Sequence, residues 1–349
     1  MPRTPDMEPG IREAMLYKPG PKGRLVCFLC AHRCKVGDGK AGICGVRENR
    51  GGKLYTLVYG LVIAGHMDPI EKKPLFHFGP GSTSMSIATP GCNFHCSFCQ
   101  NWSISQATKG KGRNLRASSE AISPGELVAL SKRQGCLSIS YTYTEPTIFF
   151  EYAYETAVMA SAEGLKNVFV TNGYMTPEAL DAIHPHLHAA NVDLKAFNDR
   201  TYRRTIGGTL KPVLESIKTM KAQGVWLEVT TLVVPTVNDS EGELRDIAQF
   251  IESVGPEIPW HISAFHPDHN LRDLPPTPVR TLVRAMEIGK ECGLRYVYTG
   301  NVPGHEGEHT LCYSCGASLI KRFGFQVLEN RMKGGGCPKC GVQVDGFFV

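Results

Sequence analysis

The stretch Gly91–Gln100 reads GCNFHCSFCQ and contains three of the thirteen cysteines of the chain, Cys92, Cys96 and Cys99. Their spacing, C-x3-C-x2-C, lets one short loop direct three thiolates at a common point. Three thiolates, rather than the four of a closed site, suit a cubane iron–sulfur cluster with one iron left open to a small molecule. The alternative is a closed zinc or electron-transfer site with His95 as the fourth ligand, although such sites usually show four ligands plainly.

Strand and helix patterns alternate around this loop, from about residue 83 to residue 301. Strands are expected at Thr83–Ala88, Leu137–Tyr143, Asn167–Thr171, Asn191–Lys195, Trp226–Val234, Trp260–Ala264 and Arg295–Thr299. Helix-like stretches lie between most of them, which indicates βαβ units and a parallel sheet. Such units can curl into a full or partial barrel, with its chemistry at the carboxyl ends of the strands. The three-cysteine loop follows the first strand and is expected at that end.

Capping signals mark the starts of four expected helices. Ser123 with Glu126, and Ser240 with Glu243, fit capping boxes, in which the serine and the glutamate each cover a free backbone amide. Thr176 and Thr277 each precede a proline at the first helical position. These signals support the alternation of helices with strands.

The C-terminal tail carries a second group of cysteines, in two C-x2-C pairs separated by 21 residues: Cys312, Cys315, Cys337 and Cys340. Paired C-x2-C elements are typical of closed, tetrahedral zinc sites. A tail this small could scarcely fold without a metal. We therefore expect zinc here, with rubredoxin-like iron as the alternative. His305 and His309 lie nearby but are not needed as ligands.

A third group lies near the N-terminus, with four cysteines within 18 residues: Cys27, Cys30, Cys34 and Cys44. Four thiolates suit either zinc or an auxiliary [4Fe–4S] cluster that passes electrons to the first one, and we slightly favour zinc. Disulfides are the weakest option in a reducing cell. The two remaining cysteines, Cys136 and Cys292, stand alone and are expected to act as small buried apolar residues.

Cysteine usage and pattern divide the chain into three expected domains. Residues 1–80 form a four-cysteine module, residues 81–303 a partial (β/α)6 TIM-like barrel of the α/β class, and residues 304–349 a zinc-ribbon-like domain. The charged fraction is 20% and the net charge +5, with no long Lys/Arg block, so we expect no nucleic-acid partner. No apolar run approaches the ~18 residues of a membrane span and no signal sequence is visible, so we expect a cytoplasmic protein without membrane contact.

Several motifs resemble the radical S-adenosylmethionine (SAM) superfamily, in particular relatives of the pyruvate formate-lyase activating enzymes. They are the three-cysteine loop, residues 68–77 (DPIEKKPLFH), residues 141–146 (YTYTEP) and residues 193–195 (DLK). Within this group, the N-terminal C-x2-C-x3-C-x9-C and residues 300–304 (GNVPG) are similar to the radical SAM family of the AmmeMemoRadiSam system.

The resemblance implies a [4Fe–4S] cluster on Cys92, Cys96 and Cys99, with SAM bound to its open iron. One electron would cleave SAM into methionine and a 5′-deoxyadenosyl radical, which would take hydrogen from a protein, as in glycyl-radical activation, or from a small molecule. It further implies an oxidoreductase served by an electron donor such as flavodoxin or ferredoxin. Memo-type and AMMECR-type proteins are implied as partners.

The resemblance also assigns roles to residues at the strand ends. Glu145 would accept hydrogen bonds from the SAM ammonium group, unless it serves as an acid at a helix N-terminus. Asp193 would hold the SAM ribose or a cation, with Lys195 beside it, and the alternative is a structural ion pair.

Four further residues are expected around SAM. Thr171 and Asn172 end the third strand, but Val170 replaces the acidic residue that helps to bind a cation in the activating enzymes, so that cation site is not carried over. Phe98 would pack against the adenine, or simply belong to the core. His266 matches a histidine that approaches SAM, although a structural histidine is equally expected.

Two other functions compete with a radical SAM enzyme. One is a zinc-ribbon protein that binds nucleic acid or modifies RNA, in which the central cysteines are structural. The weak basic bias and the acidic strand ends argue against it. The other is an electron carrier, which has no need of a barrel large enough for SAM.

Overall fold

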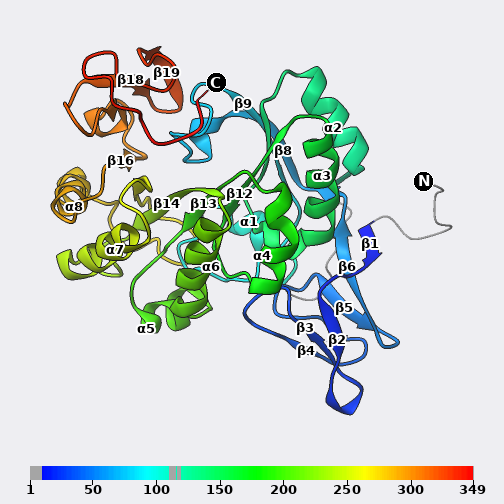
Figure 1. The fold of residues 1–349 in the computed structure, drawn as a ribbon. Helices are drawn as coiled ribbons and strands as arrows, with labels where there is room; N and C mark the ends of the chain where they lie inside the picture. Colours follow the sequence, from blue (N-terminus) through cyan, green and yellow to red (C-terminus); the bar gives the residue numbers. More distant parts are fainter. Residues whose placement is uncertain (1–9, 110–114, 116–118, 349) are drawn as a thin grey trace.

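The computed structural model describes residues 10–109, 115 and 119–348. In this part of the chain the central element is an eight-stranded sheet in the order β16-β15-β14-β13-β12-β11-β9-β8 (Figure 1). The seven strands from β9 to β16 are parallel, and β8 lies antiparallel on β9. The strands are β8 (Ala64–Pro69), β9 (Thr83–Ala88), β11 (Ser138–Tyr141), β12 (Lys166–Thr171), β13 (Ala189–Asp193), β14 (Trp226–Val233), β15 (Trp260–Ala264) and β16 (Val297–Gly300).

All seven expected strands are present, and their parallel pairing confirms the α/β class. The sheet has two edges, β8 and β16, so it is open rather than a closed barrel. Strand β8 falls within the expected N-terminal module of residues 1–80 but pairs with β9 over its whole length. The central sheet therefore begins before residue 81.

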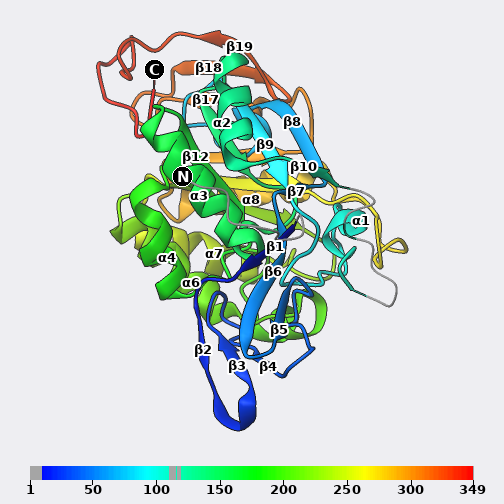
Figure 2. The ribbon, with the colours of Figure 1, turned by 90° about the vertical axis from the view of Figure 1, so that its right-hand side faces the viewer.

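Helices connect the parallel strands and cover one face of the sheet (Figures 1 and 2). They are α1 (Trp102–Ser105), α2 (Pro124–Arg133), α3 (Phe150–Ala162), α4 (Pro177–Ile183), α5 (Asp199–Thr201), α6 (Leu210–Ala222), α7 (Glu241–Val254) and α8 (Val279–Glu291). A π-helix spans Tyr202–Ile206, and short 3-10 turns span Pro21–Gly23, Ile70–Lys72, Pro146–Phe149, His184–His186 and Glu306–Glu308. No helix in the described ranges is both long and apolar enough to cross a bilayer.

The predicted helix starts are confirmed in part. Ser123 and Glu126 form a complete capping box, and Thr176 caps α4 through the amide of Ala179. Ser240 caps α7, but the Glu243 carboxylate accepts from the backbone amide of Phe197 instead of reaching back.

The expected cap at Thr277 is wrong. Helix α8 starts one residue later, with Pro278 at the N-cap and no side-chain cap. The Thr277 hydroxyl instead donates to the carbonyl of Val233 and accepts from the amide of Phe265, because it lies where two strand ends need partners.

The parallel strands alternate between two surfaces, since successive side chains point to opposite sides of a sheet. In β15, Trp260 and Ile262 are fully buried and alternate with His261 and Ser263, which line the central cavity described below. The buried indole N–H of Trp260 is satisfied, because it donates to Thr231 Oγ1 at 3.0 Å. One face of the sheet is thus an apolar core, and the other is polar.

Two small domains lie at opposite ends of the molecule (Figures 1 and 2). The N-terminal one contains the sheets β1-β6-β5 and β2-β3-β4, and the C-terminal one contains the sheet β17-β18-β19. The strands are β1 (Gly10–Glu13), β2 (Tyr17–Pro19), β3 (Leu25–Cys27), β4 (Lys35–Val36), β5 (Arg47–Arg50), β6 (Lys53–Tyr59), β17 (Thr310–Leu311), β18 (Ser318–Phe323) and β19 (Gln326–Asn330). A separate pair joins β7 (Leu61–Val62) to β10 (Glu120–Ala121).

Candidate functional site

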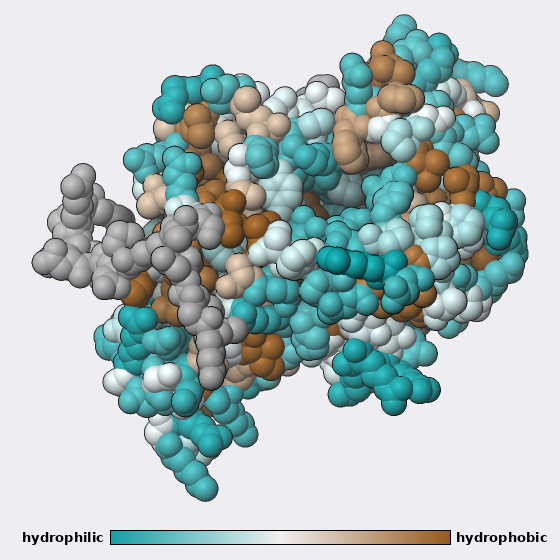
Figure 3. Space-filling view, turned by 180° about the vertical axis from the view of Figure 1, so that it is seen from behind, coloured by the Kyte–Doolittle hydropathy of each residue, from teal (hydrophilic) through white to brown (hydrophobic). Residues whose placement is uncertain are grey.

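A cavity of about 520 Å³ lies at the carboxyl ends of the parallel strands. Strands at both ends of the sheet order contribute to its wall, from the loop after β9 to Thr299 at the end of β16. The sheet therefore curves around the cavity, and Phe325 of the C-terminal domain also reaches its wall. The molecule is visibly hollowed below the C-terminal domain when seen from behind (Figure 3).

The three cysteines of the central loop all line this cavity. Cys96 is buried, while Cys92 and Cys99 are partly exposed. The loop is held by two backbone bonds to the π-helix, from the amide of His95 to Ile206 O at 3.0 Å and from that of Ser97 to Thr205 O at 2.8 Å. The thiols are thus fixed at the strand end where the sequence predicted them.

A glycine pair after the π-helix makes room for this loop. A Cβ on Gly207, whose φ is +96°, would lie 2.2 Å from the ring of His95, and one on Gly208 would lie 2.4 Å from the ring of Phe94. His95 is therefore packed against backbone. The alternative in which His95 is a fourth ligand beside the loop cysteines stays a prediction.

Burial dominates the acid–base behaviour of the cysteines. It raises the pKa of Cys96 to about 12, although the nearby charge of Lys195 opposes the shift, and it raises the pKa of Cys92 well above its usual range. The free thiols of Cys92 and Cys96 are therefore protonated at neutral pH. Metal binding would displace their protons, because the thiolate is the ligand.

Glu145 is buried at the end of β11 and joins it to the end of β12. Its Oε1 accepts from the hydroxyls of Thr147 and Thr171 and from the amide of Thr147, and its Oε2 accepts from the amide of Asn172 at 2.8 Å. Burial raises the pKa of this carboxyl, against the effect of these donors. Because a carboxylate oxygen has two lone pairs, Oε2 retains one for a further donor in the cavity.

Asn172 connects this strand end to the cysteine loop. Its Nδ2 donates to Asn93 Oδ1 at 2.7 Å and lies 3.9 Å from the sulfur of Cys92. A short chain of hydrogen bonds therefore runs from Glu145 through Asn172 to the residue that follows the first cysteine. The sequence placed Asn172 at the site but did not predict this link to the loop.

Asp193 and Lys195 form an ion pair on the cavity wall, with 2.7 Å between Oδ2 and Nζ. Burial alone would lower the pKa of Lys195, but the negative charge of Asp193 raises it. The ammonium group thus stays charged beside the cysteine loop. A structural ion pair was the expected alternative to a role of Asp193 in binding the SAM ribose or a cation. In this position both side chains still face the cavity.

The remaining predicted residues divide between the cavity and the surface. Phe98 and Thr171 are buried and line the cavity. His266 is exposed after β15 and is absent from the cavity wall as far as the described residues show. The histidine of this strand that does line the cavity is His261, whose Nε2 lies 2.6 Å from Glu228 Oε2. The SAM contact of His266 stays a prediction.

A second lysine on the cavity wall, Lys73, was not predicted from the sequence. Lys73 is 1% exposed, and its Nζ lies 2.7 Å from Asp68 Oδ2 and 4.4 Å from the ring centre of Tyr143. Burial lowers the pKa of Lys73 to about 8, despite the opposing charge of Asp68. Tyr143 is held at a φ of +60°, a strained value for a bulky residue, which is common at functional sites. The pair of lysines in residues 68–77 was the available signal.

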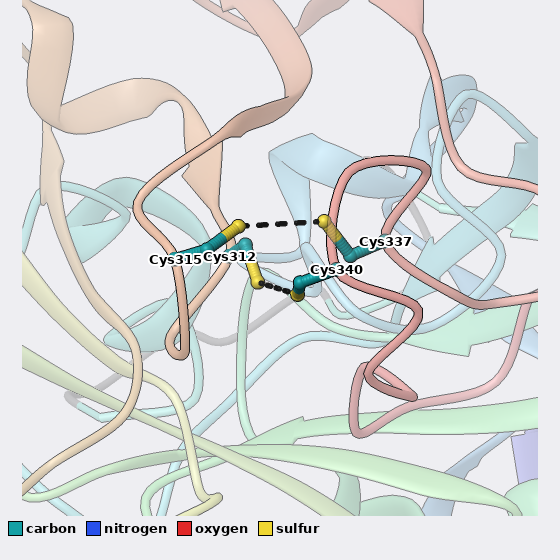
Figure 4. A group of neighbouring side chains, drawn as sticks. All are labelled: Cys312, Cys315, Cys337 and Cys340. Atoms are coloured by element: carbon teal, nitrogen blue, oxygen red, sulfur yellow. Dashed lines mark hydrogen bonds between the residues drawn. The ribbon is translucent and has the colours of Figure 1, made fainter.

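The C-terminal cysteines converge on one point (Figure 4). The ligand atoms of Cys312, Cys315, Cys337 and Cys340 all lie within 4.8 Å of one another. The sulfur atoms of Cys312 and Cys340 are 3.6 Å apart, and those of Cys315 and Cys337 are 3.7 Å apart. A tetrahedral ion with bonds of about 2.3 Å places its sulfurs about 3.8 Å apart, so the group has the size of a site for one metal ion.

Comparisons with known proteins place the chain in a family. The Radical SAM superfamily profile matches residues 86–251. An uncharacterized protein of Methanocaldococcus jannaschii is 44% identical over 338 residues, which cover 96% of this chain and 99% of that protein. The chain belongs to the radical SAM superfamily. The pyruvate formate-lyase-activating enzyme of Clostridium pasteurianum is 22% identical over 227 residues, covering 61% of this chain and 92% of that enzyme.

Among solved structures, a domain of the pyruvate-formate lyase-activating enzyme from Bacteroides vulgatus aligns with a TM-score of 0.41 and 16% identity. The alignment covers 47% of this chain and 99% of that domain.

Membership of the radical SAM superfamily implies a [4Fe–4S] cluster and SAM, and the cavity fits both. Three thiols face it from one loop, and the cation of Lys195 lies beside Cys96, where it would favour thiolate ligands. The hydroxyl of Thr230 faces the same cavity but has no hydrogen-bond partner in the part of the chain that the structure describes. A buried polar atom without a partner is costly, so this wall suits a polar ligand.

Proposed function

We propose that Cys92, Cys96 and Cys99 hold the [4Fe–4S] cluster and that this enzyme uses SAM to generate a substrate radical. The observation that carries the proposal is the convergence of the three thiols on a cavity whose walls come from the carboxyl ends of the whole parallel sheet. This is the end at which barrel-like α/β enzymes carry their chemistry. Relatedness to an activating enzyme supports a radical reaction on a protein or small-molecule substrate.

The bound cluster and SAM would supply the chemistry, in which one electron cleaves SAM into methionine and a 5′-deoxyadenosyl radical that takes hydrogen from the substrate. The protein would bind and orient. Glu145 Oε2 would accept a charge-assisted hydrogen bond from the SAM ammonium group, since that oxygen keeps a free lone pair. Asn172 would hold the cysteine loop in place through Asn93.

The other walls of the cavity would enclose the reaction. Phe98 would supply an apolar surface for the adenine, and Asp193 would hold the ribose or a cation while Lys195 keeps it oriented. Enclosure matters because a reactive intermediate must be kept from water and stray reductants. Lys73, paired with Asp68, and Tyr143 line the same cavity and would face the substrate.

Four finer predictions belong to this proposal. Glycyl-radical activation is the reaction that relatedness to the activating enzymes favours, with a flavodoxin or ferredoxin as electron donor. Memo-type and AMMECR-type proteins remain predicted partners. Zinc remains the metal predicted for the C-terminal site.

The test is anaerobic reconstitution with iron and sulfide, followed by dithionite and SAM. We expect 5′-deoxyadenosine from the wild type and none above background from Cys96→Ala. The matched control is Cys136→Ala, which removes another buried thiol, one outside the walls of this cavity. Absence of 5′-deoxyadenosine from a fully reconstituted wild type, or its production by Cys96→Ala, would refute the proposal.

A further inference from the structure

The four N-terminal cysteines surround a small enclosed cavity of their own. Cys27 ends β3, Cys30 and Cys34 follow in the next loop, and Cys44 precedes β5. All four line the cavity, together with the side chain of Arg47. Cys27 and Cys44 are buried and the other two are partly exposed. Four cysteines spread over the segment from Cys27 to Cys44 thus line one small cavity.

Arg47 brings a buried positive charge to the wall of this cavity. Its side chain is 2% exposed, and its Nη1 lies 3.0 Å from Glu151 Oε1. Its Nη2 donates to the carbonyl of Met15, whereas Nε has no hydrogen-bond partner among the described residues. A guanidinium with an unpartnered N–H group, buried against four neutral thiols, would be costly. The same group beside thiolates would be stabilised, because sulfur anions accept hydrogen bonds and neutralise charge.

We infer that Cys27, Cys30, Cys34 and Cys44 bind a metal centre through four thiolates, and that Arg47 compensates its negative charge. Four thiolates around a zinc ion, or around a [4Fe–4S] cluster in its common oxidised state, leave a net charge of about minus two. Glu151 takes up part of the guanidinium charge and leaves the remainder for the sulfurs. This centre is separate from the three-cysteine site and does not depend on the proposed reaction.

The spacing of the sulfurs differs from that of the C-terminal group. Within the described ranges, the four C-terminal cysteines form a group compact enough to hold one ion, whereas the N-terminal cysteines do not form such a group. A less compact arrangement suits a cluster, whose irons and sulfides separate the thiolates. The enclosed volume of about 10 Å³, however, is the size of a single ion or water molecule. The shared property is therefore a soft metal centre held by four thiolates, and measurement distinguishes ion from cluster.

The centre also adjoins the loop of the three central cysteines. His32, between Cys30 and Cys34, donates from Nε2 to the carbonyl of Asn93 at 2.8 Å, which fixes the residue after Cys92. Its ring packs edge-on against Tyr174, with 4.8 Å between the ring centres. The peptide between two predicted ligands thus contacts both the cysteine loop and the segment after β12. Metal binding would order this contact.

The experiment uses the full chain with Cys92, Cys96 and Cys99 all replaced by alanine, so that the central cluster is absent. Iron, zinc and acid-labile sulfide are then measured per chain after anaerobic purification. We expect one metal centre beyond that of the C-terminal cysteines. Adding Cys27→Ala and Cys30→Ala should abolish this second centre, whereas adding Cys136→Ala and Cys292→Ala should leave it. Iron with sulfide and visible colour indicates a cluster, and colourless zinc indicates an ion.

Arg47 provides a test that keeps all the cysteines. Arg47→Met should lose the second centre to a chelator about tenfold faster than the parent, the range expected for a partner of metal ligands. The control is Arg50→Met, on the same strand but exposed. Circular dichroism verifies that each variant is folded. Equal metal content with and without Cys27 and Cys30, rapid alkylation of all four thiols in the folded protein, or a disulfide among them would overturn the inference.

Discussion

Arg322 on strand β18 forms an ion pair with Glu71 in the segment that precedes β9, with 3.5 Å between Nε and Oε1 and no exposed surface on either side chain. Arg322 also donates to the carbonyl of Phe76 at 2.9 Å and to Thr310 Oγ1 at 2.8 Å. The C-terminal domain is therefore joined to the cavity wall through one buried cation, since Glu71 lines the cavity.

Replacing Arg322 should consequently destabilise the whole protein. Arg322→Met leaves the Glu71 carboxylate buried without its partner, and such changes cost about 3–5 kcal/mol. Arg331→Met is the control, because Arg331 pairs with Glu329 at the exposed surface, where a pair is worth less than about 1 kcal/mol. Urea unfolding of both variants measures the difference. Equal losses for the two variants would contradict a structural role for the buried pair.

The parallel sheet was predictable because each strand is a short apolar run between turn and capping signals. Thr83–Ala88 and Trp260–Ala264 agree with the prediction at both ends. The edge strand β8 was missed because its exposed residues, such as His66 and Met67, lack an apolar run. Its position depends on pairing with β9, which no local pattern encodes.

The candidate site was predictable to the extent that its residues follow strands. Cys92, Glu145, Thr171 and Asp193 all reach the cavity for this reason. Lys73 comes before the first parallel strand, β9, and reaches the cavity because the chain folds back between β8 and β9. Its place could therefore not be predicted from the ends of the parallel strands. Similarly, His266 lies only two residues after β15, yet the chain turns it to the surface while His261 faces inward.

The charge of Lys195 gives a prediction for the cysteine loop that rests on the proposed function. Lys195→Met removes the cation beside Cys96 and leaves Asp193 unpaired on the cavity wall. We expect about tenfold less 5′-deoxyadenosine per minute and weaker retention of the cluster, as for other groups that orient metal ligands. Lys218→Met is the control, since it breaks an exposed ion pair on α6. Unchanged cluster content and activity in Lys195→Met would contradict this role.

His77 predicts how stability depends on pH. Its Nδ1 lies 2.7 Å from the carbonyl of Asp345 and its Nε2 2.6 Å from the Tyr298 hydroxyl, so both ring atoms have partners in the neutral state. Burial lowers the pKa of His77 to about 4, from an ordinary value near 6.5. Between these two values the unfolded chain binds the proton and the folded chain does not. Stability therefore falls as the pH is lowered from about 6.5 to about 4, by about 3 kcal/mol from this group.

Urea unfolding at several pH values tests this expectation. His77→Gln should lose that part of the pH dependence. For each variant, the free energy of unfolding at low pH is compared with its own value at neutral pH. The control is His66→Gln, in which an exposed histidine of β8 is replaced and the dependence should remain. The same acid-induced loss in His77→Gln as in the wild type would show that other groups cause it.

The C-terminal cysteines predict one tightly bound metal ion that stabilises its own domain and the contacts of Arg322. Cys337→Ser should remove about one equivalent of metal per chain, expected to be zinc, because a tetrahedral site needs all four thiolates. Since binding energy at such sites is folding energy, the domain should become sensitive to protease. Metal analysis and limited proteolysis of the full chain measure both effects, with Cys292→Ser as the control for loss of a thiol. Iron in place of zinc would correct the identity of the metal, and full retention of metal by Cys337→Ser would refute the site.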